Sequence, residues 1–395
     1  MNALSNLLAL PETEKAERGL RHTPAEIAQQ PQTWRSTFEV FCRRREEIIG
    51  FLGQAGVWAE DPASRPTVLL LGAGTSDYIG QSLTYLLRKL WLCEVTAVPS
   101  TDLLTHQQEI ILPHRRYLWI SFSRSGDSPE GVAVLERALE ARPDILHLIV
   151  TCNARGRMVR ETAGRKQALS ICLDDAVNDR GLAMTSSFSN MVVFGQCLAH
   201  ARDFQRYVNV FENVVQAGKR FLPAAADCGA ELSRLPLTKA YMVGSGPLRA
   251  VARESALKLL ELTAGKTLSM SESALGLRHG PMAALDENTL FICFLSGSPR
   301  VQKFELDLLE EICQKGLVRH RIVVAGNGQL FDNASEQELA SISAPVLTDD
   351  YRPPVDVIFG QLLGLFFSLK WNLQPDTPSP TGAISRVVHN VTIHA

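Results

Sequence analysis

The sequence contains no apolar run long enough to span a membrane, which argues against an integral membrane protein. It also lacks a block of basic residues, and its formal net charge of −2 gives no electrostatic footprint for nucleic acid. The amino terminus has neither the basic start nor the cleavage pattern of a secretory signal. We therefore expect a cytoplasmic protein that binds neither nucleic acid nor membrane.

The eight cysteines are scattered singly, without a C-x-x-C motif and without a histidine at zinc-ligand spacing. Several of them stand within apolar runs and are expected to be small buried apolar residues. This distribution fits a reducing compartment, and no metal site is predicted.

At 395 residues the chain is too long for one ordinary core, which favours two domains. Short apolar strands such as "YLWISF" and "ILHLIVTC" alternate with helical stretches, which predicts an α/β fold with parallel sheets covered on both faces. The order strand, glycine turn, helix in "LLLGAGTSDYIGQSLTYLL" recurs in "YMVGSGPLRAVARESALKLL", which indicates an internal duplication. The predicted parts are a helical leader over 1–63, a first domain over 64–210, a second domain over 211–371 and a tail over 372–395.

The first glycine turn, "GAGTS", resembles the start of a dinucleotide fingerprint but lacks the third glycine, because the sixth position is Asp77. No acidic residue follows the next strand where a ribose would need one, so no nicotinamide cofactor is predicted. Two alternatives remain. The turn either holds no ligand, or it binds a small polar ligand through Gly74, Thr75, Ser76 and the amides at the helix start.

A second motif, "SFSRSGDSPE", follows directly on an apolar strand and predicts a loop that opens a helix. The hydroxyls of Ser123, Ser125 and Ser128 can donate to one anion, Gly126 allows close approach of the backbone, and Arg124 supplies positive charge. A simple serine-rich helix cap would need only one hydroxyl. The motif therefore favours a phosphate site.

A third block, "ESALKLLELTAGK", places Glu254, Lys258 and Glu261 on one face of a helix. Taken alone, this spacing is more typical of a solvated, salt-bridged surface than of a functional site. The nearby "LRHGP" places His279 before a rigid Gly-Pro turn, which predicts a loop position rather than a core position. A histidine there is either an ordinary polar side chain or a functional one.

The three motifs together resemble those of the sugar isomerase (SIS) family, and two tandem units resemble the isomerase half of glucosamine-6-phosphate synthase. The opening "TPAEIAQQPQTW", the "RHGP" block and the "SPTGAISRVV" tail are most similar to the AgaS branch. That branch comprises galactosamine-6-phosphate deaminase/isomerases and tagatose-6-phosphate ketose/aldose isomerases. The resemblance implies two doubly wound, flavodoxin-like domains and a phosphosugar substrate.

Several residue roles are implied by this resemblance. The family's base maps onto Glu261, which would move a proton between C2 and C1, and Lys258 is its neighbour. The histidine that opens the sugar ring maps onto His279, which in the relatives comes from the other subunit and would make the active site a property of a homodimer. Thr185 and Ser186 lie in a segment that lines the sugar site, although a capping role is equally open.

The tail departs from the synthase pattern. The synthase carries a lysine there that forms a Schiff base with the ketose, and Arg386 stands at that position. An arginine stays protonated and cannot form the imine, so it could only clamp an oxygen or the phosphate electrostatically. Prolines exclude a helix from the tail, which leaves a disordered end or a docked strand over "ISRVVHNVTIH".

The preferred function is deamination and isomerisation of galactosamine 6-phosphate to tagatose 6-phosphate and ammonia, without a cofactor. One alternative is a tagatose-6-phosphate isomerase that releases no ammonia, and another is a phosphosugar sensor without activity. The corresponding loop of the second domain, "FLSGSP", lacks the full hydroxyl cluster. One phosphate site per chain is therefore expected, in the first domain.

Overall fold

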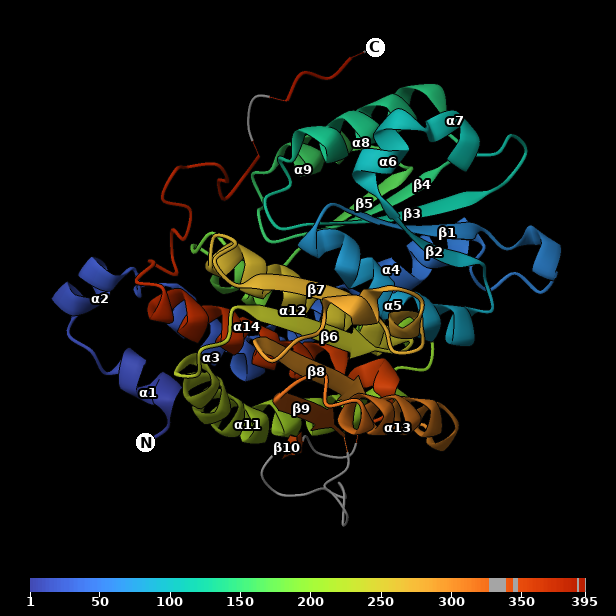
Figure 1. Cartoon of the computed structure of the whole chain (residues 1–395). Coiled ribbons are helices and arrows are strands. Elements are labelled where there is room, and N and C mark those ends of the chain that lie inside the picture. Colours follow the sequence, from blue (N-terminus) through green and yellow to red (C-terminus); the bar gives the residue numbers. More distant parts are fainter. Residues whose placement is uncertain (327–338, 344–346, 389–390, 395) are drawn as a thin grey trace. The chain divides into compact units, whose positions relative to one another are not determined.

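The computed structural model describes residues 1–326, 339–343, 347–388 and 391–394. The chain forms two compact units, each assembled from more than one stretch (Figure 1). Among the described residues, no helix combines the length and the apolar character that a membrane span requires. The β1–β5 unit contains Gln32–Asp179, Ser186–Val208 and Ile384–Ala395, and the β6–β10 unit contains Met1–Pro31, Arg180–Thr185 and Asn209–Ala383.

The β1–β5 unit is built on a parallel sheet with the strand order β2-β1-β3-β4-β5. This is the doubly wound order in which helices cross over on both faces of the sheet. β3 and β4 are buried along their whole length, because neighbours and helices cover both of their faces. The strands are β1 (Thr67–Gly72), β2 (Val95–Pro99), β3 (Tyr117–Ser123), β4 (Leu146–Thr151) and β5 (Ala168–Cys172).

The two faces of this sheet are covered by different helices. Leu69 and Trp119 pack with Val134 of α8 (Pro129–Ala141) in one apolar cluster. On the opposite face, Gly80 of α5 (Thr75–Trp91) lies so close to the strands that a Cβ added there would stand 2.9 Å from Leu70 Cβ. Successive apolar side chains of each strand point to opposite faces of the sheet, so helices pack on both faces and form a three-layer arrangement.

The β6–β10 unit repeats the same architecture. Its parallel sheet has the order β10-β9-β8-β6-β7, which is the order of the other sheet written in reverse. The predicted α/β class and the tandem duplication are confirmed. The strands are β6 (Lys239–Gly244), β7 (Leu268–Ser273), β8 (Thr289–Leu295), β9 (His320–Ala325) and β10 (Leu339–Ser343).

In the β6–β10 unit, α12 (Pro247–Leu262) packs closely against α14 (Pro353–Lys370). A Cβ at Gly360 would stand 2.3 Å from Ser255 Oγ, and one at Gly364 would stand 2.9 Å from the main-chain oxygen of Lys258. The two glycines therefore allow α14 to lie against the turn of α12 that carries Lys258. This packing fixes the helix that bears the predicted base.

The remaining α-helices and 3₁₀ turns complete the two units. The further α-helices are α1 (Ala3–Leu8), α2 (Glu12–Arg18), α3 (Thr23–Ala28), α4 (Gln30–Ala55), α6 (Ser100–Thr105), α7 (Gln107–Ile110), α9 (Arg157–Thr162), α10 (Ser186–Ala199), α11 (Gln205–Ser233) and α13 (Pro299–Gln314). The 3₁₀ turns are η1 (Pro62–Ser64), η2 (Asp175–Val177), η3 (Gly276–Arg278), η4 (Pro281–Ala284) and η5 (Asp349–Tyr351).

The strands expected from apolar runs are present, but the sequence pattern missed β7 and β10. β7 reads "LSMSES", which is too polar to be recognised as a strand by its composition. The predicted alternative of a docked strand in the tail is not found, because the described tail residues contain no strand. His389 and Asn390, which fall within that predicted strand, lie outside the described residues.

Candidate active site

The serine-rich motif forms the connection between β3 and α8, and we call residues 123–128 the anion loop. Ser123 Oγ accepts a hydrogen bond from the backbone N–H of Gly126, at 3.0 Å. Ser125 Oγ accepts one from the N–H of Asp127, at 3.1 Å. Each hydroxyl keeps its own proton for donation, because it acts here only as an acceptor.

The end of the anion loop is the start of α8. Gly126 has φ 65°, in the left-handed region that a glycine adopts without strain. Ser128 is the N-cap of α8, and its side chain makes no capping hydrogen bond. The positive end of the helix dipole and the first helical N–H groups are located here. A hydroxyl-rich turn at such a helix start is suited to an anion.

Arg124 and Arg386 connect the anion loop to the tail within the β1–β5 unit. Arg124 is 6% exposed, and its guanidinium donates to the main-chain oxygen of Arg386. The Arg386 side chain donates from Nε to the main-chain oxygen of Asp179, at 2.6 Å, and from Nη2 to Asn178 Oδ1, at 2.6 Å. Arg386 therefore anchors the tail to the segment before α10.

The start of α10 is capped by Asp179. Its carboxylate accepts hydrogen bonds from the N–H groups of Ser186 and Ser187, both at 2.9 Å, and from the Ser187 hydroxyl, at 2.5 Å. An aspartate at a helix start is stabilised by the free N–H groups and by the helix dipole. Thr185 and Ser186 are fully buried, and the main-chain oxygen of Thr185 accepts from Gln361 in the β6–β10 unit. Asp179, a residue that the sequence analysis did not single out, thus caps this helix start, and the roles predicted for Thr185 and Ser186 stay predictions.

The first glycine turn is a tight connection between β1 and α5. Gly74 has φ 55°, and a Cβ at Gly72 would stand 2.3 Å from the backbone of Ser76, so both positions require glycine. Thr75 and Ser76, the first residues of α5, are 5% and 6% exposed. Their binding role stays a prediction.

The helix α12 carries the predicted proton-transfer residues. Lys258 is 1% exposed, and its Nζ lies 2.6 Å from Glu261 Oε2 and 3.4 Å from Glu254 Oε1. Glu254 is fully buried, whereas the Glu261 side chain is 24% exposed. The alternative of a solvated surface cluster is therefore excluded. The buried Lys258 ammonium is held between the two carboxylates, because without them its charge would be buried and uncompensated.

His279 lies between the turns η3 and η4 of the β6–β10 unit, and it is exposed. The following Gly280 has φ 117°, and the preceding Arg278 is held by Glu311 at 2.6 Å. The predicted loop position is confirmed. An exposed imidazole on an anchored turn is accessible to a ligand or to a second chain.

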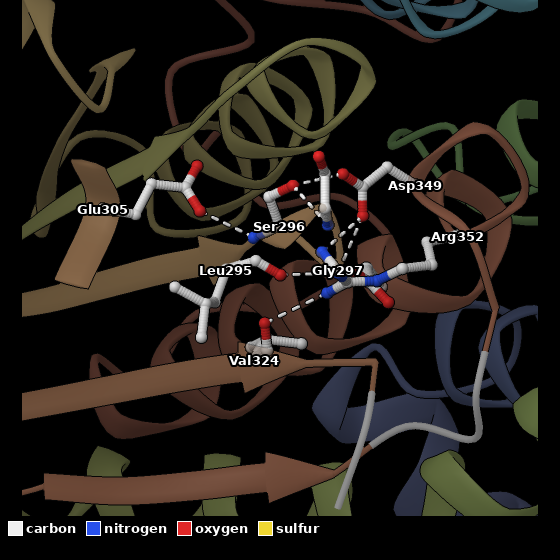
Figure 2. A network of polar contacts seen from close by, with 9 residues as sticks. Leu295, Ser296, Gly297, Glu305, Val324, Asp349 and Arg352 are labelled. Carbon is white, nitrogen blue, oxygen red and sulfur yellow. Dashed lines mark hydrogen bonds and ion pairs between the residues drawn. The ribbon is translucent and has the colours of Figure 1, made fainter. Parts of the chain in front are cut away.

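The loop between β8 and α13 stands where the duplication places the counterpart of the anion loop (Figure 2). Gly297 N–H donates to Asp349 Oδ1 at 2.8 Å, and the Ser296 hydroxyl donates to the other oxygen of the same carboxylate. The Ser296 N–H donates to Glu305 Oε2 at 2.6 Å. Carboxylates of the chain itself thus accept the hydrogen bonds of this loop.

The structure groups the predicted residues by unit. Within the described ranges, no cluster of three or more His, Cys, Asp or Glu side chains has the arrangement of a metal site. The β1–β5 unit holds Gly74, Thr75, Ser76, Ser123, Arg124, Ser125, Gly126, Ser128, Ser186 and Arg386, and the β6–β10 unit holds Thr185, Lys258, Glu261 and His279.

Two doubly wound sheets with a hydroxyl-rich helix start define a protein of the double sugar isomerase class. No protein-family model matches the chain. A Streptomyces coelicolor protein described as a candidate D-galactosamine-6-phosphate deaminase AgaS is 36% identical over 387 residues, which cover 95% of each chain. The D-galactosamine-6-phosphate deaminase AgaS of Shewanella sp. (strain ANA-3) is 31% identical, over 99% of this chain and 96% of the relative.

A solved structure is similar to this chain over nearly its whole length. The crystal structure of tagatose-6-phosphate ketose/aldose isomerase from Escherichia coli superimposes with a TM-score of 0.84 and 31% identity, over 94% of this chain and 96% of the other. The chain belongs to the AgaS family. The resemblance found in the sequence motifs is confirmed.

Proposed function

We propose that this chain converts amino-hexose 6-phosphates into ketose 6-phosphates and ammonia, with galactosamine 6-phosphate and tagatose 6-phosphate as the preferred pair. The observation that supports this most is the buried Lys258–Glu261 pair on α12, in a chain whose AgaS relatives are named as galactosamine-6-phosphate deaminases. We place the reaction in the cytoplasm.

The proposed reaction begins with the open-chain aldehyde of the substrate. Glu261 removes the proton from C2; the electron pair forms the C1–C2 double bond while the C1 carbonyl π bond breaks, and its oxygen takes a proton from water to give an enolamine. Return of a proton to C1 gives a ketimine at C2, and water attack on this carbon expels ammonia and leaves the ketone. One carboxylate over one face of the sugar can perform both proton transfers.

In this proposal Lys258 acts through Glu261. Its ammonium lies 2.6 Å from the Glu261 carboxylate and holds in place the side chain that accepts the C2 proton. The anion loop would bind the phosphate with the hydroxyls of Ser123, Ser125 and Ser128. Hydrogen bonds to a charged acceptor contribute about 1.5–3 kcal/mol each.

We further propose that the enzyme is a homodimer and that His279 acts across the subunit interface to open the sugar ring. The exposed position of His279 on an anchored turn supports this role. Arg386 is proposed to hold the tail in place rather than to react with the sugar, since its side chain donates hydrogen bonds to Asn178 and Asp179.

The test is ammonia release from galactosamine 6-phosphate by purified protein, with glucosamine 6-phosphate and tagatose 6-phosphate alongside. Glu261→Gln should lower kcat by about 10²–10⁴-fold while phosphosugar binding remains, because the amide cannot accept the proton. Glu310→Gln, on an exposed position of α13, is the matched control and should retain activity. Full activity of Glu261→Gln would remove this residue as the base.

The same variants test the interface. His279→Ala alone should also be inactive, and a one-to-one mixture with Glu261→Gln should recover about a quarter of wild-type activity, because half of the dimers are mixed and each has one intact site. No recovery from two well-folded proteins that exchange subunits would place His279 in its own subunit's site.

A second candidate is isomerisation of tagatose 6-phosphate without deamination. The similarity to the Escherichia coli protein, which is named as a tagatose-6-phosphate ketose/aldose isomerase, favours this candidate. Conversion of tagatose 6-phosphate together with no ammonia from either amino sugar would select this candidate.

A further inference from the structure

The anion loop is supported by a second loop, residues 152–156, between β4 and α9; we call it the supporting loop. β3 and β4 are neighbours in the sheet, so the loops that follow their carboxyl ends lie side by side. The two loops contact each other through main-chain groups and through the side chain of Asn153.

Three consecutive carbonyl groups of the anion loop accept hydrogen bonds from this neighbour. The Arg124 oxygen accepts from the N–H of Cys152 at 3.2 Å, and the Gly126 oxygen accepts from the N–H of Met158, in the first turn of α9, at 2.9 Å. Between them, the Ser125 oxygen accepts from Asn153 Nδ2 at 2.8 Å. The outer two bonds are main-chain bonds, and the central one depends on a side chain.

The direction of these carbonyls determines the direction of the next N–H groups. The peptide bonds are trans and planar, so the N–H of each following residue points away from the carbonyl before it. With the three carbonyls turned to the supporting loop and the start of α9, the N–H groups of residues 125, 126 and 127 are turned to the opposite side. There the N–H groups of Gly126 and Asp127 donate to the hydroxyls of Ser123 and Ser125, which keep their own protons for an anion.

Asn153 is held in one orientation. Its Oδ1 accepts from the N–H of Arg155 at 3.1 Å, while Nδ2 also lies 3.3 Å from Asp127 Oδ2. The other oxygen of Asp127 accepts from the N–H of Arg157, at 2.7 Å. A flipped amide would place its oxygen against two oxygens, so only the described orientation satisfies these neighbours.

The backbones of the two loops are also in close contact. A Cβ added to Gly156 would stand 2.7 Å from the main-chain oxygen of Ser125 and 3.0 Å from Gly126 Cα. A side chain at this position would therefore displace the central part of the anion loop. The absence of a side chain at Gly156 is what allows Asn153 to reach the Ser125 oxygen.

We propose that Asn153 is a positioning residue for the phosphate of the substrate: its amide holds the Ser125 carbonyl against the supporting loop and thereby fixes the Gly126 N–H that holds the Ser123 hydroxyl, so that the hydroxyls of the anion loop are directed toward the anion. This role rests on the proposed phosphosugar function, but it concerns binding and not proton transfer. Asn153 need not contact the substrate.

The experiment compares Asn153→Ala with the control Asn209→Ala, an exposed position on α11. For ammonia release from galactosamine 6-phosphate, Asn153→Ala should raise KM by about tenfold and leave kcat within about twofold, because a contact that binds substrate and transition state equally is lost. The inhibition constant of inorganic phosphate should rise by a similar factor. An unchanged KM and phosphate constant in a folded variant would overturn the inference, as would a loss confined to kcat.

Two further variants separate positioning from general destabilisation. Asn153→Asp places an oxygen against both the Ser125 oxygen and Asp127 and should impair phosphate binding at least as much as Asn153→Ala. Gly156→Ala should raise KM in the same way. Unimpaired phosphate binding by either folded variant would argue against the positioning role.

Direct phosphate binding, measured by calorimetry, keeps the two proposals distinct. If the wild-type protein releases no ammonia but its phosphosugar affinity still depends on Asn153, the proposed function fails and the positioning role stands. If ammonia is released and phosphate affinity is independent of Asn153, the positioning role fails and the proposed function stands.

Discussion

The anion loop and the β8–α13 loop follow the central strand of two sheets with the same strand order, yet their donors meet different acceptors. In the anion loop, N–H groups meet the neutral hydroxyls of Ser123 and Ser125. In the β8–α13 loop, they meet the carboxylates of Glu305 and Asp349 (Figure 2). Neutral hydroxyl acceptors add no negative charge at the helix start, whereas carboxylates do.

One substitution in the repeat accounts for part of this difference. At the same distance from the proline that opens each helix, α8 carries Leu135 and α13 carries Glu305, and both are buried. Burial raises the pKa of Glu305, against the hydrogen bonds from Ser245 and Ser296 that favour its charged form. Duplication thus produced two similar loops, of which one has its own anions built in and the other remains suited to an anion from solution.

The largest expected effect comes from removing the hydroxyls of each loop in turn. Ser123→Ala with Ser125→Ala should raise KM for the amino-sugar phosphate by about 100-fold, since two hydrogen bonds to a charged acceptor are lost. Ser296→Ala with Ser298→Ala should leave KM within about twofold, because that loop is closed by Asp349. Steady-state kinetics on the two double variants measure the difference. Equal losses would mean that both loops bind substrate.

Much of this comparison could be anticipated from local pattern. Local composition and helical periodicity were sufficient to predict the anion loop and the helix that follows it. They also predicted that Lys258 and Glu261 share one face of a helix, because these residues are close in sequence. The exposed turn at His279 followed from Gly-Pro chemistry. These features depend on neighbours in the chain.

The residues that were missed are brought to the site by the order of strands. Asn153 reaches Ser125 only because β4 lies beside β3, and Asp349 reaches Gly297 across 52 residues of sequence. Arg386 bonds to Asp179 across 207 residues. Sequence periodicity predicts that strands are parallel, but not which two loops become neighbours, so partners of this kind were not predictable.

A smaller effect is expected from Asp349→Ala, which removes the built-in anion. The Ser296 hydroxyl and the Gly297 N–H would lose their acceptor, and the free energy of unfolding should fall by about 1–3 kcal/mol. Inorganic phosphate should then raise the melting temperature of this variant more than that of the wild type, because a second anion site has been opened. Asp349→Asn, which keeps an acceptor for Gly297, is the control, and its phosphate-dependent shift in melting temperature should lie between those of Asp349→Ala and the wild type. Equal phosphate-dependent shifts in all three proteins would show that Asp349 does not stand in for an anion.

The smallest effect concerns Asp356 of α14, which pairs with Arg352 Nη2 at 2.7 Å. Both side chains are fully buried, and Arg352 also contacts Asp349 at 3.3 Å. Burial raises the pKa of Asp356 to about 6 from an ordinary value of 3.8, although the charge of Arg352 opposes this rise.

Because the folded state holds this proton more tightly than the unfolded state, Asp356 favours folding most below about pH 4, and this contribution is lost as the pH rises to about 6. Asp356→Asn does not titrate, so the stability of the wild type relative to this variant should decline between those values and then remain level. Urea unfolding of both proteins at several pH values measures the difference. A relative stability that stays level over this interval and instead rises with pH below about pH 4 would mean that the attraction of Arg352 outweighs burial.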